Sequence, residues 1–458
     1  MAEKITINPI TRINGFMEIE ADIEKESIVD AKTKGMMFRG FEKMLQGRSP
    51  FDAVYFTQRI CGICSTAHSM ASALALEEAL NIVPSQQGRY LRDLLHACEF
   101  LQNHLRHFYQ FTLPDYVKLP DDYPLFKRDH NDYRFPKDIN DKMVNDYFES
   151  LEFSRSAHQM LAILGGKAPH NHGVFIGGIT SPVSADMIIS IKSILYGIGQ
   201  FIMGKMIPDV YTIGTYYPEY YHMGGGYGNL LTYGSFYDYR DLGTLYVDPL
   251  VFSKGRTSPF DPDLITQEDE YAWFNEEDEP DRSKPQAYSW IKAPRYDNVP
   301  YEVGPLARQW LSGEYGNGIS AMDRTIARAL EAKKIVEIMQ TLIDNLIPGV
   351  SMQEEYEIPV QSSGKGLVDT TRGALGHWLY IENREIAFYQ IITPSAWNLS
   401  TQSNGMKGTG EQALIGTPVN NVETPVEIGR IIRSFDPCVS CATHVFSGGK
   451  HMNTIQIV

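Results

Sequence analysis

The chain has 458 residues, of which 43% are hydrophobic and 21% are charged, as expected of a globular protein with a large core in one or two domains. This composition excludes a disordered or fibrous protein. Acidic residues outnumber basic residues by 56 to 41, and the formal net charge of -15 would repel a phosphate backbone. We therefore expect no nucleic-acid partner.

The sequence predicts neither a membrane span nor a secretory signal. The most apolar stretch, residues 187–207, contains Lys192 and Lys205, which is typical of an amphipathic or buried helix. Residues 1–20 lack the apolar segment of a signal peptide. We expect synthesis in the cytoplasm and membrane contact only through partners. The sequence leaves the final location open.

Residues 4–40 alternate in hydrophobicity and are rich in β-forming residues, which predicts a small N-terminal sheet. Further along the chain, apolar residues recur with helical spacing in long segments, at residues 66–82, 86–112, 140–164, 182–206 and 319–346. We therefore predict an α+β protein, mainly α, with a central bundle of long helices and small peripheral sheets.

Two other regions differ from the long helical segments. Residues 208–318 are broken by glycine, tyrosine, proline and acidic stretches, which predicts short strands and surface loops without a clear domain of their own. Residues 366–393 alternate as in a β-hairpin, with ENRE as the turn. The SGKG at 363–366 lacks the spacing of a phosphate-binding loop, and no GxGxxG follows a strand.

Cysteine placement carries most of the chemical information. Four of the five cysteines form two Cys-x-x-Cys pairs, each followed by a histidine: RICGICSTAH near the N-terminus and DPCVSCATH near the C-terminus. In an acidic chain with so few cysteines, such pairs indicate redox chemistry or metal ligation more than disulfides. Cys98 lies within a helical pattern and is expected in the core.

Two pairs brought together would form a four-thiolate site for a soft metal. A structural zinc site is the alternative, and zinc ribbons also use paired cysteines. Their pairs are usually about 15–20 residues apart, whereas 374 positions separate Cys64 from Cys438 here. So long a separation favours a buried functional centre over a structural clasp, although the residues alone leave both open.

The motifs around these cysteines resemble the large, catalytic subunit of nickel-iron hydrogenases over nearly the whole chain. The matching segments occur in the family's order: PITRINGFMEIE, FRGFEKMLQGRSPFDAVYFTQRICGIC, GGKAPH, YGNLLTYG, TTRGALGHW, TPSAWNLS, ALIGTPV and DPCVSCATH. The resemblance implies the family's large-subunit fold and the reaction H2 ⇌ 2H+ + 2e−.

The resemblance also implies the metal ligands. Cys61 and Cys438 would be terminal ligands of nickel, whereas Cys64 and Cys441 would bridge nickel to an iron that carries cyanide and carbon monoxide. Thiolates suit both metals and can accept a proton. In heterolytic cleavage of H2, the Cys438 sulfur and Arg372 are the candidate proton acceptors.

Four polar side chains would support this centre. By the resemblance, His68 would donate a hydrogen bond to a bridging sulfur, and Arg372 would orient cyanide and polarise H2. Ser395 matches a residue that hydrogen-bonds the second cyanide. Asp436 would anchor Arg372. Without the resemblance, His68 would be read as an ordinary core histidine and the others as loop residues.

The resemblance implies a second metal site and two protein partners. Glu42, the carbonyl of Leu399 and a nitrogen of His444 match the protein ligands of magnesium or a similar divalent ion. Too few cysteines remain to hold iron-sulfur clusters, so electrons would pass to an iron-sulfur small subunit, giving a heterodimer or a higher oligomer. In this family, a maturation endopeptidase cuts after the final histidine. Residues 1–444 would then form one catalytic domain, and residues 445–458 an extension removed on maturation.

Three departures from the family pattern bear on function. Asn14 replaces a glutamate that commonly relays protons, Asn103 replaces a common aspartate, and Thr371 replaces the proline before Arg372. An amide has no proton to exchange at ordinary pH, so protons would leave by another route. These changes favour either an uptake enzyme with modified proton transfer or an H2-sensing regulatory hydrogenase with little turnover. A quinone-binding relative of respiratory complex I is less consistent, since that subunit has lost the cysteine pairs.

Overall fold

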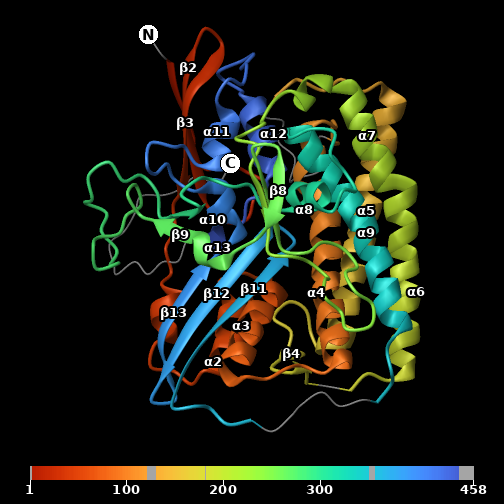
Figure 1. Ribbon diagram of the computed structural model, residues 1–458. Coiled ribbons are helices and arrows are strands. Elements are labelled where there is room, and N and C mark those ends of the chain that lie inside the picture. The colour runs from red at the N-terminus through yellow and green to blue at the C-terminus, as the bar shows by residue number, and fades with distance from the viewer. Residues whose placement is uncertain (1–2, 121–129, 181, 350–355, 443–458) are drawn as a thin grey trace.

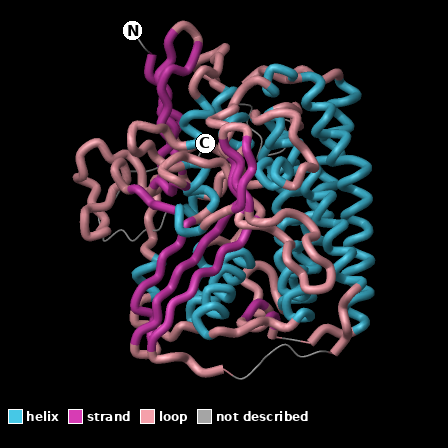
Figure 2. The backbone as a smooth tube through the Cα atoms, in the orientation of Figure 1, coloured by secondary structure: helices cyan, strands magenta, loops and turns pink. Residues whose placement is uncertain are grey.

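The computed structural model describes residues 3–120, 130–180, 182–349 and 356–442. Long helices occupy one side of the molecule, and strands with long connecting loops gather on the other (Figure 2). This arrangement confirms the predicted α+β fold with a central helix bundle and small separate sheets.

Four long helices form the bundle: α4 (Gln86–Arg106), α5 (Lys137–Gly165), α6 (Ala185–Phe201) and α9 (Ala321–Asp344) (Figure 1). α4 and α6 each contact both α5 and α9, so the four helices enclose a common core. Each forms because apolar residues recur with helical spacing, and serine side chains cap the starts of α4, α6 and α9. Ser85 and Ser320, for example, accept hydrogen bonds from backbone amides of the first turns of α4 and α9.

α6 continues through a π-helical turn into α7 (Ile207–Tyr216). Among the residues that the structure describes, the joined helix Ala185–Tyr216 alone has the length and apolar composition of a membrane span. It packs against α5 and α9, and buried core helices share this composition. The expectation that the chain has no membrane span stays a prediction.

The N-terminal sheet is antiparallel, with strand order β1 (Glu3–Ile7), β2 (Met17–Glu24) and β3 (Ser27–Gly35). Alternate residues of β2 are buried, as period-two alternation predicts. α11 (Thr409–Leu414) packs on β3 and joins the sheet to the C-terminal part of the chain.

A second antiparallel sheet is formed by β11 (Gln361–Thr370), β12 (Gly373–Glu382) and β13 (Glu385–Ile392). The predicted ENRE turn joins β12 to β13. The structure adds β11, so residues 371–372 form a second turn at the opposite end of β12.

Helix α3 (Ser65–Leu80) lies directly on β11 and β12. The approach depends on glycine: a Cβ on Gly366 would lie 1.9 Å from the carbonyl oxygen of Ala71. The sheet therefore supports the helix that begins immediately after Cys64.

The remaining elements are short. Residues 208–318 contain the predicted short strands and loops, together with short helical segments that the sequence did not predict. Short helices flank the cysteine motifs and the bundle: α1 (Phe41–Leu45), α2 (Asp52–Thr57), α8 (Pro305–Leu311), α10 (Pro394–Leu399), α12 (Val426–Ser434) and α13 (Val439–Ala442). The short strands are β4 (Val174–Phe175), β5 (Gly178–Ile179), β6 (Leu230–Thr232), β7 (Leu250–Ser253), β8 (Arg256–Pro259), β9 (Ile265–Glu268) and β10 (Ala293–Tyr296).

Candidate metal centre

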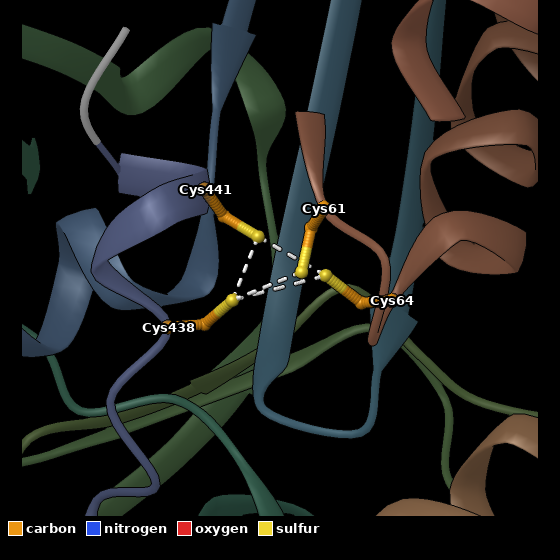
Figure 3. A group of neighbouring side chains, drawn as sticks. All are labelled: Cys61, Cys64, Cys438 and Cys441. Carbon is orange, nitrogen blue, oxygen red and sulfur yellow. Dashed lines mark hydrogen bonds between the residues drawn. The ribbon is translucent and has the colours of Figure 1, made fainter. Parts of the chain in front are cut away.

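The two cysteine pairs meet in the interior (Figure 3), where all four sulfurs lie within 4.8 Å of one another. The Sγ–Sγ distances are 2.8 Å from Cys438 to Cys441, 3.0 Å from Cys64 to Cys441 and 3.5 Å from Cys61 to Cys438. None of the four is more than 6% exposed, and none forms a disulfide. Four converging buried thiols are the donor set that a soft metal requires.

Local structure explains why the sulfurs converge. Cys61 is in extended conformation directly after a 3₁₀ turn, and Cys64 is the residue before the first turn of α3. Cys438 and Cys441 lie just before and within α13. A spacing of three residues at such a turn directs both sulfurs of a pair to the same side, so each motif contributes two adjacent ligands.

The N-terminal loop fastens onto the C-terminal motif. Asn14 forms an isolated β-bridge with Cys438, and its backbone carbonyl accepts a 2.7 Å hydrogen bond from the amide of Val439. Gly15 has a φ of +92°, and a Cβ there would lie 2.5 Å from the backbone nitrogen of Ser440. Only glycine fits this approach, which holds the side chain of residue 14 over the sulfurs.

The amide of Asn14 contacts both sulfurs that the resemblance implies as terminal ligands. Its Nδ2 lies 3.1 Å from the Sγ of Cys61 and 3.0 Å from the Sγ of Cys438. An amide N–H can donate to a thiolate, but it cannot accept a proton at ordinary pH. This position therefore stabilises the anionic sulfurs without offering a protonation site.

The thiols perturb one another strongly. Hydrogen bonds from Cys438 and the other two thiols lower the pKa of Cys61 well below its usual range. The Cys438 thiol and its neighbours raise the pKa of Cys64, and burial raises that of Cys441. Four buried thiols in contact cannot all ionise unless cations neutralise them. The site is therefore suited to bound metal.

Arg372, in the turn between β11 and β12, forms a buried polar cluster beside the sulfurs. Its Nη2 lies 3.0 Å from Oδ1 of Asp436, and its Nε donates to the backbone carbonyl of Asp436 at 2.9 Å. Burial alone would lower the pKa of Arg372, but the charges of Asp436 and then of the thiols raise it. Arg372 is thus held as a cation that faces the sulfurs.

Asn103 completes this cluster. Its Oδ1 accepts hydrogen bonds from Arg372 at 2.7 Å and from Arg106 at 3.1 Å, and its Nδ2 donates to Asp436 at 2.7 Å. A neutral amide therefore stands between two guanidinium groups and one carboxylate. Burial and the charge of Arg372 lower the pKa of Arg106 to about 10.

His68 and Ser395 make contacts that the sequence did not predict. Nδ1 of His68 lies 3.1 Å from Nε2 of His377, and Nδ1 of His377 lies 2.8 Å from the hydroxyl of Tyr389. The hydroxyl of Ser395 accepts a 2.9 Å hydrogen bond from the amide of Cys438. His377 is in the GALGHW motif, but β-strand alternation alone gave no reason to place it against His68.

Arg39 ties the two cysteine motifs together through their backbones. Its guanidinium donates to the carbonyl of Ile60, which precedes Cys61, and at 2.6 Å to the carbonyl of Ser440, which precedes Cys441. Sequence reasoning missed this role. The only signal was its place in FRGFE.

Glu42 and Leu399, which were expected to bind the second ion, lie in different surroundings. Glu42 lines a small cavity of about 30 Å³ together with Ile391 and Cys441, and it accepts a 2.8 Å hydrogen bond from the amide of Ile391. The carbonyl of Leu399 instead accepts a hydrogen bond from the Thr33 hydroxyl at 3.1 Å, and Leu399 does not line this cavity. The structure thus places Ile391, and not the carbonyl of Leu399, beside Glu42, and the ligand role of Leu399 stays a prediction. A count along TPSAWNLS could not reveal which carbonyl faces the cavity.

His444 and the extension 445–458 lie outside the described residues. The expected ligand and the expected cleavage site therefore remain predictions. The described part of the chain ends at Ala442, one residue after Cys441.

The fold and this donor set define a protein with a buried four-thiol site that could hold a metal. Comparisons with known proteins specify which one. The sequence model of the family described as nickel-dependent hydrogenase matches residues 39–122, 124–318 and 312–444. The periplasmic [NiFeSe] hydrogenase large subunit of Desulfomicrobium baculatum is 34% identical over 501 aligned residues, covering 99% of this chain and 98% of that protein.

Other relatives agree. The hydrogenase-2 large chain of Escherichia coli K12 is 28% identical and is covered in full, as is this chain. The Ni-Fe-Se hydrogenase from D. vulgaris Hildenborough in the reduced state superposes with a TM-score of 0.93 at 36% identity, over 97% of this chain and 100% of that chain. The chain belongs to the nickel-dependent hydrogenase family. It is the large subunit of a hydrogenase, an oxidoreductase that interconverts H2 with protons and electrons.

Proposed function

We propose that the four convergent cysteines hold a nickel-iron centre whose iron carries cyanide and carbon monoxide. Cys61 and Cys438 would bind nickel alone, and Cys64 and Cys441 would bind both metals. The observation that supports this best is the contact among four buried sulfurs that two distant motifs bring together. When bound, such a centre supplies Lewis acidity and redox-active metal for the heterolytic cleavage of H2.

Arg372 and Cys438 would act nearest to the reacting hydrogen. Arg372 presents a fixed positive charge to the sulfurs, so it favours the charge separation that develops when H2 is polarised. Asp436 and Asn103 position Arg372 through three of its contacts. The Cys438 sulfur remains the candidate proton acceptor, because a guanidinium held as a cation cannot accept a further proton. The Ser395 hydroxyl remains a candidate donor to cyanide.

Glu42 and Ile391 would hold the second ion, with His444 as a further ligand and water completing the coordination. Carboxylate and carbonyl oxygens suit a hard cation such as magnesium. Burial raises the pKa of Glu42, with Lys292 opposing this rise. A cation beside Glu42 would restore the carboxylate form.

Electrons from the centre would pass to an iron-sulfur small subunit, because the described cysteines are all at the centre except Cys98, which is buried in α4. The relatives from D. baculatum and E. coli K12 have names that specify a large subunit or large chain. The compartment of this protein would follow that of the small subunit.

During maturation, an endopeptidase would cut the His444–Val445 bond. An uncut tail on active, nickel-loaded enzyme would contradict the cleavage.

H2-dependent dye reduction by the purified heterodimer tests turnover. Robust reduction that requires nickel supports an uptake enzyme. H2 binding with little turnover would instead support the second candidate function, an H2 sensor. The observation that favours a sensor is the amide of Asn14 on both terminal sulfurs, where proton transfer would otherwise begin.

A further inference from the structure

One buried face of α4 carries polar side chains one helical turn apart, in the order Asn103, Glu99, His96 and Arg92. All four are 3% exposed or less. Residues three or four apart on a helix have Cβ atoms about 5–6 Å from each other. Burial of polar groups in a core helix is unfavourable unless they are paired or used. The row begins beside Arg372, through Asn103, and leads away from the metal centre.

Glu99 is the second residue of this row and lies next to the cysteine motif. Its carboxylate accepts hydrogen bonds from the backbone amides of Thr66 at 2.7 Å and Ala67 at 3.2 Å, in the first turn of α3. Burial raises the pKa of Glu99 to about 7, although the amides oppose this, and the Cys61 thiol raises it further. A carboxyl group with a pKa near 7 can both accept and release a proton at neutral pH.

His96 lies one turn further on, at the wall of a cleft of about 220 Å³. The half-buried Arg89 and Asp93 also line this cleft. Within the described part of the chain, Nε2 of His96 is buried and has no hydrogen-bond partner. Burial lowers the pKa of His96 to about 3. A neutral imidazole can still pass a proton by accepting it at one nitrogen and releasing another from the second.

We propose that α4 carries the proton path of this enzyme from the metal centre to the cleft, with Glu99 as the inner relay and His96 as the outer relay. This path would take over the step that Asn14 cannot perform. The proposal rests on the proposed nickel-iron function. Glu99, unlike Asn14, is not bonded to a sulfur in the structure, so the Thr66 hydroxyl or a water would bridge the first gap.

Each transfer conserves charge and involves no electrons. A sulfur–hydrogen bond at the centre breaks and an oxygen–hydrogen bond forms on Glu99, leaving a thiolate. Glu99 then protonates Nε2 of His96, whose Nδ1 proton leaves to water in the cleft. Return of the imidazole to its first tautomer resets the path.

The test compares Glu99→Gln with Glu411→Gln in the heterodimer. Glu411 is a matched control: it is buried, accepts backbone amides of Thr33 and Gly408, and has a pKa raised by burial to about 7, but its contacts lie at the N-terminal sheet and α11. Exchange of D2 with H2O should fall roughly 100-fold in E99Q. It should change less than twofold in E411Q.

Further variants separate relay from structure. Glu99→Asp should recover most of the exchange, and Asn14→Glu added to E99Q should restore it by a separate route. His96→Gln should reproduce the loss if E99Q fails to assemble. Nickel content and the cyanide and carbonyl infrared bands should be unchanged in every variant. Wild-type exchange in E99Q and H96Q, or an equal loss in E411Q, would overturn the path, whereas absence of nickel from the wild type would overturn the proposed function instead.

Discussion

Two buried arginine–aspartate clusters in this molecule differ in how fully the charges are paired. In the first cluster, Asp115 accepts hydrogen bonds from Nη2 of Arg12 at 2.6 Å and from Nε and Nη2 of Arg433 at 2.7 and 2.6 Å. At the metal centre, by contrast, Nη2 of Arg372 is the one guanidinium nitrogen of the described residues that pairs with the Asp436 carboxylate, and the other carboxylate oxygen accepts from the Asn103 amide.

The two clusters differ in the groups that surround their buried charges. The Asp115 cluster satisfies its carboxylate with guanidinium groups on both oxygens, as a structural ion pair does. Arg372, in contrast, interacts electrostatically with the thiols as well as with Asp436, and both interactions raise its pKa. The charge of the neighbouring thiols, and not the degree of carboxylate pairing, therefore distinguishes Arg372 as part of a candidate functional site.

Asp115→Asn should produce the largest effect on stability. It removes the charge that balances Arg12 and Arg433, and leaving such groups unpaired costs about 3–5 kcal/mol. We expect a much lower unfolding temperature, measured by calorimetry. Nickel content per folded chain should be retained. Asp436→Asn is the matched variant, and an equal loss of stability there would remove the distinction between the two clusters.

Arg372→Lys should impair catalysis more than folding. Lysine keeps the charge beside Asp436 but cannot reproduce the planar set of donors. Loss of one aligned charged donor typically slows a reaction by roughly 100-fold or more, so H2-dependent dye reduction should fall by that order. The unfolding temperature and infrared bands should remain close to those of the wild type. A normal rate would show that Arg372 does not act on H2.

Asn14→Glu should change proton exchange while leaving the metals in place. A carboxyl group at this position can accept a proton from either sulfur, so D2/H2O exchange should rise roughly tenfold if proton escape limits it. Asn14→Gln is the control, since it lengthens the side chain and keeps the amide. Equal behaviour of the two variants would show that chemistry at this position does not limit exchange.

Glu411→Gln should have the smallest effect, visible in the pH dependence of stability. Glu411 has no arginine partner among its described contacts, and burial raises its pKa from 4.5 to about 7. The folded state therefore binds an extra proton between these values, so stability falls as pH rises from about 4.5 to 7. Glutamine does not titrate, and the slope should flatten by on the order of 1 kcal/mol per pH unit within this interval. An unchanged slope would contradict the raised pKa.

Sequence patterns were sufficient for the main architecture and the donor set. Helical periodicity located the bundle helices to within a few residues, since their apolar faces are long and regular. The cysteine motifs predicted the convergence of four sulfurs. Three-dimensional neighbours could not be predicted in this way: the pairing of His68 with His377 depends on how α3 packs on β12, and the backbone contacts of Arg39 have no sequence pattern.

The position of the Leu399 carbonyl away from Glu42 could not be predicted for the same reason. Residues 391–399 pass from the end of β13 into α10, so consecutive carbonyls point in different directions. Sequence spacing gives no means of choosing between them. The structure places Ile391 against Glu42 because the carboxylate accepts from its backbone amide.

Metal analysis combined with infrared spectroscopy of the purified heterodimer tests the central proposal most directly. Nickel and iron should be present at the large subunit in equal amounts, with bands of cyanide and carbon monoxide bound to iron. Replacement of any one of the four cysteines by serine should abolish them. Zinc without nickel, or a nickel-containing protein without those bands, would contradict the account.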